Sequence, residues 1–242
     1  MRILVISDIH ANLTALEAVL ADAGTYDQVI CLGDLVGYGP DPNECVDLIH
    51  RLPNMTCLLG NHDAASLGQI DLNNFNHEAK LSSEWARDVL TEENKNILSS
   101  LPETIIIDDI FLAHGSPRNP VWEYMLDAHI AAINFRFFDT QLCFVGHTHL
   151  PIGYFLNGDL QLLEWKLFKM DAPVHIEERA ILNPGSVGQP RDHDPRAAYA
   201  IYHSEKKLWE PRRIHYDITS VQQRIQKAGL PVRHATRLEQ GW

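Results

Sequence analysis

The sequence has no long apolar run and no cluster of basic residues. None of its apolar stretches approaches the roughly 18 residues that a transmembrane helix needs, and the apolar run before Asp8 is too short for a signal peptide. The net charge is −12, and phosphate backbones attract clustered cations. We therefore expect a cytoplasmic protein with no membrane partner and no general nucleic-acid-binding surface.

The sequence also lacks a Cys-x-x-Cys pair, internal repeats, linkers and low-complexity segments. Its four cysteines are scattered, and Cys31, Cys57 and Cys143 lie in apolar runs where a reduced thiol packs as a small hydrophobic group. No disulfide is expected. The 242 residues are predicted to form one domain, 1–242, with a helical segment at about 64–101.

The first part of the chain alternates between strand and helix patterns. Apolar runs at 2–7, 28–33 and 55–60 predict strands, and the apolar spacing at 12–24 and 42–53 predicts helices. Strands that alternate with helices are typical of βαβ units. The pattern predicts an α/β fold with a sheet that is at least partly parallel.

The middle of the chain is polar and helical, and the second half is rich in strands. Thr91 is a candidate N-cap, and we expect segment 64–101 to pack on the main body, which is compatible with a role as a lid. Further on, we predict strands at 104–108, 110–114 and 141–146, helices at 127–138 and 220–229, and hairpins at 152–165, with its turn at Asn157-Gly158, and at 197–216.

Five polar motifs each follow an apolar, strand-like run. They are "SDIH" (Asp8, His10), "GDLVGYGP" (Gly33, Asp34), "GNHD" (Asn61, His62, Asp63), "AHGSP" (His114) and "GHTH" (His147, His149). Loops that leave the carboxyl ends of strands converge at one edge of an α/β sheet. Singly, Asp8 fits a helix cap and His114 a core histidine, but together the five motifs predict one metal site.

The five motifs in this order resemble the signature of the calcineurin-like metallophosphoesterase superfamily. Within it, "SDIHAN", "GDLVGYGPDPNEC" and "NPGSVGQPRD" resemble the bacterial and archaeal phosphodiesterase branch related to diadenosine tetraphosphatase. The resemblance implies a central β-sandwich of mixed sheets flanked by helices. It also implies hydrolysis of a phosphodiester or a nucleotide-type phosphoanhydride by attack of a metal-bound hydroxide on a small phosphorylated substrate, such as a nucleotide.

By resemblance, two divalent ions share Asp34, whose two oxygens suit a bridging ligand. Asp8, His10 and His149 complete one metal site, and Asn61, His114 and His147 complete the other. Two such ions can clamp the attacking and leaving sides of a phosphoryl displacement. Mixed oxygen and nitrogen ligands suit manganese, our first expectation, and also iron, zinc, nickel or cobalt, among which the spacing does not choose.

His62 is not assigned as a metal ligand and is the expected catalytic residue. It can protonate the leaving group or stabilise charge on the phosphate, and Asp63 is expected to fix its tautomer. Arg191 is the candidate substrate-binding residue because a guanidinium forks onto two phosphate oxygens, whereas Arg118 fits surface charge better. Tyr38 fits either a site residue or a packed turn residue.

Two other functions compete with this prediction. A non-catalytic scaffold with the same fold, like a retromer subunit, is expected to lack polar residues such as His62, which is present here. A metallo-β-lactamase-like enzyme needs a His-x-His-x-Asp-His run, which is absent. The motifs leave the physiological substrate, the preference for diester, monoester or anhydride, and the oligomeric state open.

Overall fold

The computed structural model describes residues 1–157 and 162–242, and its strands form two six-stranded sheets. The strands of the first sheet are β1 (Arg2–Ile6), β2 (Gln28–Cys31), β3 (Met55–Cys57), β9 (Val174–His175), β11 (Ala197–His203) and β12 (Leu208–Ile214). Their order is β3-β2-β1-β11-β12-β9, in which β1, β2 and β3 are parallel neighbours and β11 runs antiparallel to β1. This sheet contains the predicted βαβ units.

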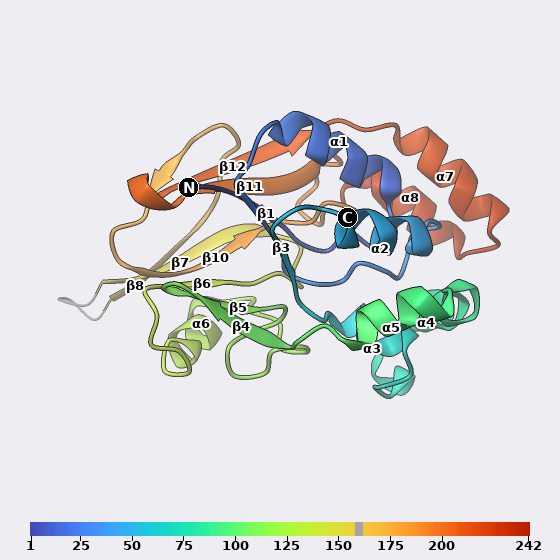
Figure 1. Ribbon diagram of the computed structural model, residues 1–242, viewed down its shortest axis with the longest axis horizontal. Coiled ribbons are helices and arrows are strands. Elements are labelled where there is room, and N and C mark those ends of the chain that lie inside the picture. Colours follow the sequence, from blue (N-terminus) through green and yellow to red (C-terminus); the bar gives the residue numbers. More distant parts are fainter. Residues whose placement is uncertain (158–161) are drawn as a thin grey trace.

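The second sheet is also mixed and packs face to face with the first (Figure 1). It contains β4 (Thr104–Ile107), β5 (Ile110–Ala113), β6 (Leu142–Phe144), β7 (Pro151–Asn157), β8 (Leu162–Leu167) and β10 (Arg179–Pro184). The order is β4-β5-β6-β10-β7-β8, with β6 parallel to both β5 and β10. The predicted hairpins are present as β7–β8 and β11–β12. The predicted turn residue Gly158 lies outside the described residues.

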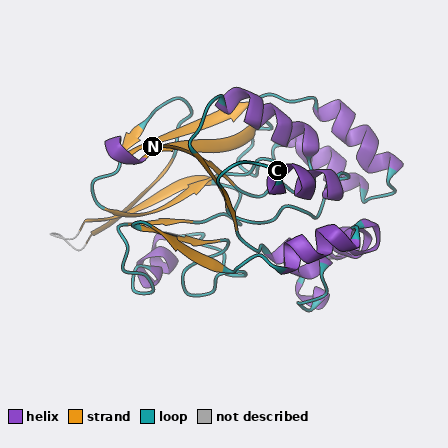
Figure 2. Ribbon diagram, viewed as in Figure 1, coloured by secondary structure: helices purple, strands orange, loops and turns teal. Residues whose placement is uncertain are grey.

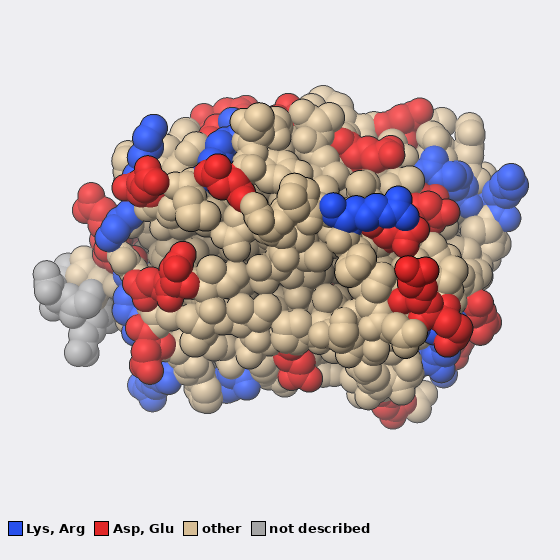
Figure 3. Space-filling view, viewed as in Figure 1, with Lys and Arg blue, Asp and Glu red and all other residues tan. Residues whose placement is uncertain are grey.

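Helices flank the sandwich, gathered at one end and along the outer faces of the sheets (Figure 2). They are α1 (Leu13–Ala23), α2 (Pro42–His50), α3 (Asn61–Ser66), α4 (His77–Val89), α5 (Glu92–Ser99), α6 (Ala128–Asn134), α7 (Ile218–Lys227) and α8 (Val232–Gln240). A central sandwich of mixed sheets flanked by helices is therefore confirmed. On the face in Figure 3, basic side chains lie interspersed among acidic ones.

Local sequence explains where these helices begin. Asn12 caps α1 by accepting from the Ala15 N–H at 3.1 Å, and Thr91 caps α5 through the Asn94 N–H at 3.2 Å, as its sequence position predicts. Segment 64–101 packs on the body through a cluster that includes Leu90 and Leu98. Helix α8 was not predicted, because its sequence "VRHATRLEQ" has few apolar residues.

The core between the two sheets depends on large, fully buried side chains. The Phe144 side chain is fully buried, and its ring lies 5.0 Å from that of Trp209 and 5.5 Å from that of Tyr202, between centroids. These rings come from both sheets, so they hold the sandwich together and fix the edge at which the polar loops meet.

Truncation of Phe144 tests this account of the core. We expect Phe144→Ala to lower the free energy of unfolding by about 3–5 kcal/mol, because it removes buried apolar area and leaves a cavity. The matched control is Phe137→Ala, since the Phe137 side chain is 50% exposed and its loss should change stability by less than about 0.5 kcal/mol. Urea denaturation measures both, and equal effects would contradict the assignment.

Candidate metal centre

The predicted metal ligands all leave the carboxyl ends of strands at one edge of the sandwich. Three strands of the first sheet (β1, β2 and β3) and two of the second (β5 and β6) end in these loops. The structure buries all seven side chains: Asp8, His10, Asp34, Asn61, His114, His147 and His149. They form one cluster.

The backbone is strained at most of these positions. Asp8, His10, Asp34, His147 and His149 all have positive φ, between 49° and 65°. Non-glycine residues adopt this left-handed conformation at a cost of roughly 1–3 kcal/mol each, and such strain concentrates at functional sites. The loops therefore adopt strained backbone conformations that place these side chains at the site.

The first group of candidate ligands joins His10, His149 and Asp8. Nε2 of His10 lies 3.1 Å from Nε2 of His149, which lies 3.4 Å from Oδ1 of Asp8. The Nδ1 atoms of the two histidines lie 3.1 Å from Val36 O and 2.5 Å from Gln189 O. Burial lowers the pKa of both rings, so each is neutral and its Nδ1–H donates to the carbonyl. The two Nε2 lone pairs then face each other, an arrangement that a shared cation stabilises.

The second group surrounds His114. Its Nε2 lies 3.1 Å from Oδ1 of Asn61, 3.2 Å from Nδ1 of His147 and 3.3 Å from Oδ2 of Asp34, while its Nδ1 lies 2.8 Å from Leu32 O. Burial opposes protonation of His114, but the charge of Asp34 outweighs it and raises the pKa of His114 to about 9. A proton therefore occupies the place between these groups when no metal is bound.

Asp34 faces both groups. Its Oδ1 accepts from the His62 N–H at 2.8 Å, whereas its buried Oδ2 has no hydrogen-bond partner in the described part of the chain. This Oδ2 lies 3.6 Å from Nε2 of His10 and 3.3 Å from Nε2 of His114. Burial disfavours the ionised carboxyl, but His114 and His62 lower its pKa well below its usual value. A carboxylate oxygen that lies between ring nitrogens of both groups suits a ligand shared by divalent cations.

Gly60 allows another segment to approach Asp34 closely. A Cβ at this position would overlap Oδ1 of Asp34. The φ of Gly60 is −92°, a value that other residues adopt readily. Close packing against the Asp34 carboxylate is therefore the reason for the glycine of "GNHD".

Asp63 does not contact the His62 ring, so the predicted hydrogen bond that fixes the tautomer of His62 is wrong. The Asp63 carboxylate instead accepts four backbone N–H groups at 2.9–3.1 Å, which belong to Asp34, Leu35, Val36 and Gly60. Burial and the charge of Asp34 raise its pKa to about 7. Asp63 thus positions the loop that carries Asp34.

Removing the Asp63 carboxylate tests this positioning role. We expect Asp63→Ala to lower the free energy of unfolding of chelator-treated protein by about 3–5 kcal/mol, because it leaves four buried donors unpaired. Asp71→Ala is the control, since Asp71 makes one exposed bond, to the Asn73 N–H, worth about 1 kcal/mol. If urea denaturation gives the two variants similar losses, the assignment fails.

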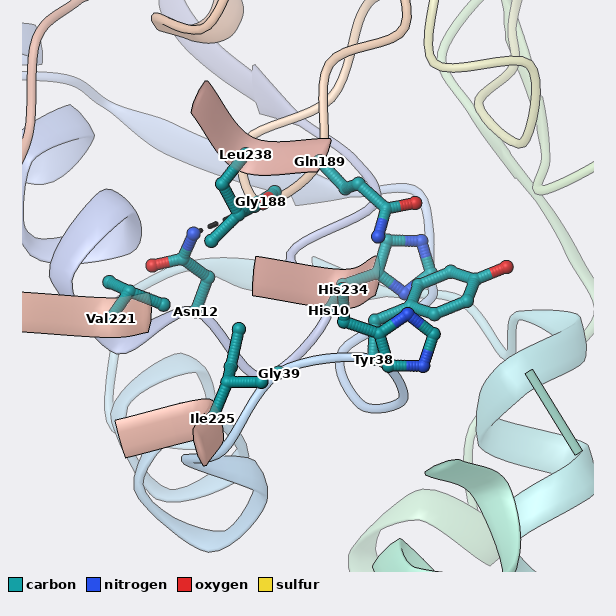
Figure 4. A pocket seen from close by; sticks show the side chains of 10 residues that line it. All are labelled: His10, Asn12, Tyr38, Gly39, Gly188, Gln189, Val221, Ile225, His234 and Leu238. Atoms are coloured by element: carbon teal, nitrogen blue, oxygen red, sulfur yellow. Dashed lines mark hydrogen bonds between the residues drawn. The ribbon is translucent and has the colours of Figure 1, made fainter. Parts of the chain in front are cut away.

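His62 and Tyr38 lie beside the clustered ligands. The Tyr38 ring is 4.6 Å from that of His10 and 4.9 Å from that of His234 (Figure 4). It is also 4.4 Å from the ring of His62. Arg191 Nη2 donates to the Tyr38 hydroxyl at 3.4 Å. Of the two open interpretations of Tyr38, the structure therefore supports a site residue. His10, Asp34 and His62 also form a third group of closely spaced candidate ligand atoms.

Several residues around the site have no clear signal in the sequence. Gln189 accepts from His149, and aromatic rings lie against two of the site histidines: the Phe75 ring is 5.1 Å from that of His62, and the Tyr124 ring is 3.7 Å from that of His147. They come from loops whose course the sequence pattern does not predict. The "NPGSVGQPRD" motif is the one available signal, and it includes Gln189.

Other polar residues take structural positions. Arg118 pairs with Glu123 on the surface, as its surface-charge interpretation predicts. Asn183 Nδ2 donates to Gly146 O at 2.6 Å, and the Ser186 hydroxyl donates to Asp8 O at 2.8 Å. These two residues fasten the loops of the site to each other.

Comparison with known proteins agrees with this geometry. A family model described as a calcineurin-like phosphoesterase superfamily domain matches residues 1–207, so the chain belongs to that superfamily. It is 46% identical to a metallophosphoesterase from Sphaerobacter thermophilus, with a TM-score of 0.92, over 100% of this chain and 99% of that one. It is 39% identical over 236 residues to an uncharacterized protein of Methanocaldococcus jannaschii, covering 95% and 93% of the two chains.

A hypothetical protein from Pyrococcus horikoshii OT3 shares the fold at 20% identity, with a TM-score of 0.81 over 100% of this chain and 98% of that one. The protein is a metal-dependent phosphoesterase, and its family implies divalent metal ions. None of the helices that the structure describes is both long and apolar enough to cross a membrane.

Proposed function

We propose that this phosphoesterase uses two divalent ions to hydrolyse a phosphodiester or a nucleotide-type phosphoanhydride. The single observation that supports the pair of ions is the position of Oδ2 of Asp34, which lies 3.6 Å from Nε2 of His10 in one group of ligands and 3.3 Å from Nε2 of His114 in the other. One ion would use one group, and the donor atoms of the other group would remain available for a second ion.

The chain offers a complete ligand set for each ion, shared at Asp34. Asp8, His10 and His149 would hold one ion, and Asn61, His114 and His147 the other. Within each group the ligand atoms lie within 4.8 Å of one another; the two groups are Asp8, His10 and His149, and Asp34, His114 and His147. Bound there, manganese or a similar dication would act as a Lewis acid on phosphoryl oxygens and lower the pKa of bound water.

His62 would contact the phosphate. Burial lowers its pKa to about 4, and the positive charge of Arg191 acts in the same direction. The ring is therefore neutral at pH 7, and its N–H can donate to a phosphate oxygen or to the leaving group. Because the ring is neutral, we favour a role of His62 in stabilising charge on the phosphate over protonation of the leaving group by an imidazolium.

Arg191 is suited to bind the substrate anion. Its guanidinium is largely buried, Nη2 donates to Gln189 Oε1 at 3.1 Å, and its buried Nε has no hydrogen-bond partner in residues 1–157 and 162–242. No carboxylate lies within ion-pair distance of it in that part of the chain. A buried cation with spare donors beside the site favours an anionic ligand.

Substitution of His62 separates catalysis from metal binding. We expect His62→Ala, reconstituted with Mn²⁺, to keep its metal content and lose about 100-fold or more in kcat on an aryl phosphodiester. The measurements are elemental analysis and steady-state kinetics on a panel of a phosphodiester, a phosphomonoester and a dinucleoside polyphosphate. The reference variants are His114→Ala, which should lose metal, and His50→Ala, which should change neither quantity because His50 is exposed.

If His62→Ala loses both metal and activity, His62 is instead a metal ligand, in the group with His10 and Asp34. No metal-dependent cleavage of any substrate on the panel by the wild-type protein would refute the proposed function and favour the non-catalytic scaffold.

A further inference from the structure

Three aromatic side chains, Phe75, Trp122 and Tyr124, border the metal centre on its solvent side. The Phe75 ring is 5.1 Å from that of His62, and the Tyr124 ring is 3.7 Å from that of His147, between centroids. Phe75 and Trp122 are half-buried and Tyr124 is 40% exposed, whereas the two histidines are buried. We call these three side chains the aromatic rim.

The aromatic rim joins two segments that are far apart in the sequence. Phe75 comes from segment 64–101. Trp122 and Tyr124 come from the loop between β5 and α6. The rings of Phe75 and Trp122 lie 5.0 Å apart between centroids, which closes the gap between the segments. The rim therefore leads from the proposed phosphate contact, His62, to a candidate metal ligand, His147.

The ring of Tyr124 has free surface beside the site. It stacks on His147 at an interplanar angle of 27°, and this is its only ring contact within residues 1–157 and 162–242. Because Tyr124 is 40% exposed, much of its ring remains accessible to a planar group. Stacking of aromatic rings is favourable beyond the burial of apolar area alone.

Glu123 holds the loop of the rim in place. Its Oε2 accepts from the Ser116 hydroxyl at 2.6 Å and from Asn134 Nδ2 at 2.8 Å, and its carboxylate pairs with Arg118. The two rings that flank Glu123 in the sequence are therefore carried by a fixed loop. A preformed surface of this kind loses little conformational freedom when a ligand binds.

Burial of the metal centre determines where the rest of a substrate lies. Asp34 and His114 have no exposed surface, so the protein surrounds a phosphoryl group bound there on its inner side. The substituent that the phosphoryl group carries then extends toward solvent, where the aromatic rim lies. Aromatic side chains stack on any planar ring, whatever its pattern of polar atoms.

We propose that the aromatic rim is a specificity-determining surface, on which Tyr124 stacks against a planar aromatic group carried by the phosphoryl group of the substrate. The inference deepens the proposed function and rests on it, because it takes the metal centre as the place where the phosphoryl group binds. Aryl phosphate esters and nucleotides share this chemistry, whereas an aliphatic ester has no ring to stack.

Ligands that differ only in their ring test the rim. Calorimetric titration of the Mn²⁺-loaded protein compares phenylphosphonate with cyclohexylphosphonate, which have the same charge and similar size. It also compares AMP with ribose 5-phosphate, which differ by the base. We expect phenylphosphonate to bind about 3- to 10-fold tighter than its partner, or AMP to bind about 5-fold or more tighter than its partner. A preference in the first pair identifies an aryl ester, and one in the second a nucleotide.

Leucine variants remove the rings one at a time. Tyr124→Leu and Trp122→Leu should each bring the preference below about twofold, whereas Tyr124→Phe, which keeps the ring, should retain it. Phe137→Leu is the matched control, because the Phe137 side chain is 50% exposed and does not belong to the rim.

Elemental analysis verifies that each variant keeps its metal. Trp122 has no ring contact with a candidate metal ligand among the residues that the structure describes, so Trp122→Leu decides the test if Tyr124→Leu loses metal. Equal affinities within both pairs of ligands, no binding of the aromatic ligands, or a preference that survives in the leucine variants would overturn the rim.

The titration needs no turnover, so the two proposals fail separately. Cleavage of the substrate panel without a preference for the aromatic ligands refutes the aromatic rim alone. A preference that the leucine variants lose, in a protein that cleaves nothing on the panel, supports the rim and refutes the proposed hydrolysis.

Discussion

The carboxylate of Asp34 is the point on which the rest of the site depends. Its Oδ1 is held by the His62 N–H, so its Oδ2 stays free between His10 and His114. The loop around it is fixed by Asp63, which binds four backbone N–H groups. The parallel strands β1, β2 and β3 bring these loops to one edge, and the second sheet supplies the remaining ligands from β5 and β6. The sandwich therefore places the Asp34 carboxylate between two groups of candidate metal ligands.

Much of this arrangement could be predicted from the sequence. The apolar runs predict most strands because buried strands carry a strong local signal, and the motifs predict the ligand cluster because each follows such a run. The role of Asp63 could not be predicted, since adjacency to His62 in sequence suggests a side-chain contact that the start of a helix at Asn61 prevents. Helix α8 and the rings of Phe75 and Tyr124 could not be placed either, because tertiary packing alone brings them to the site.

Electrostatics links the fold to the chemistry. In the absence of metal, burial keeps His10, His147 and His149 neutral, and a proton on His114 partly balances the charge of Asp34. Divalent ions would take over that balance and give the acidic chain a local positive charge for phosphate.

The most direct test of the central claim is the position of bound metal. Crystals grown with Mn²⁺ give anomalous difference maps in which we expect two peaks, about 4 Å apart, on either side of Oδ2 of Asp34. One peak should be surrounded by Asp8, His10 and His149, and the other by Asn61, His114 and His147. A single peak at full occupancy, or a second peak that Asp34 does not contact, would contradict the account.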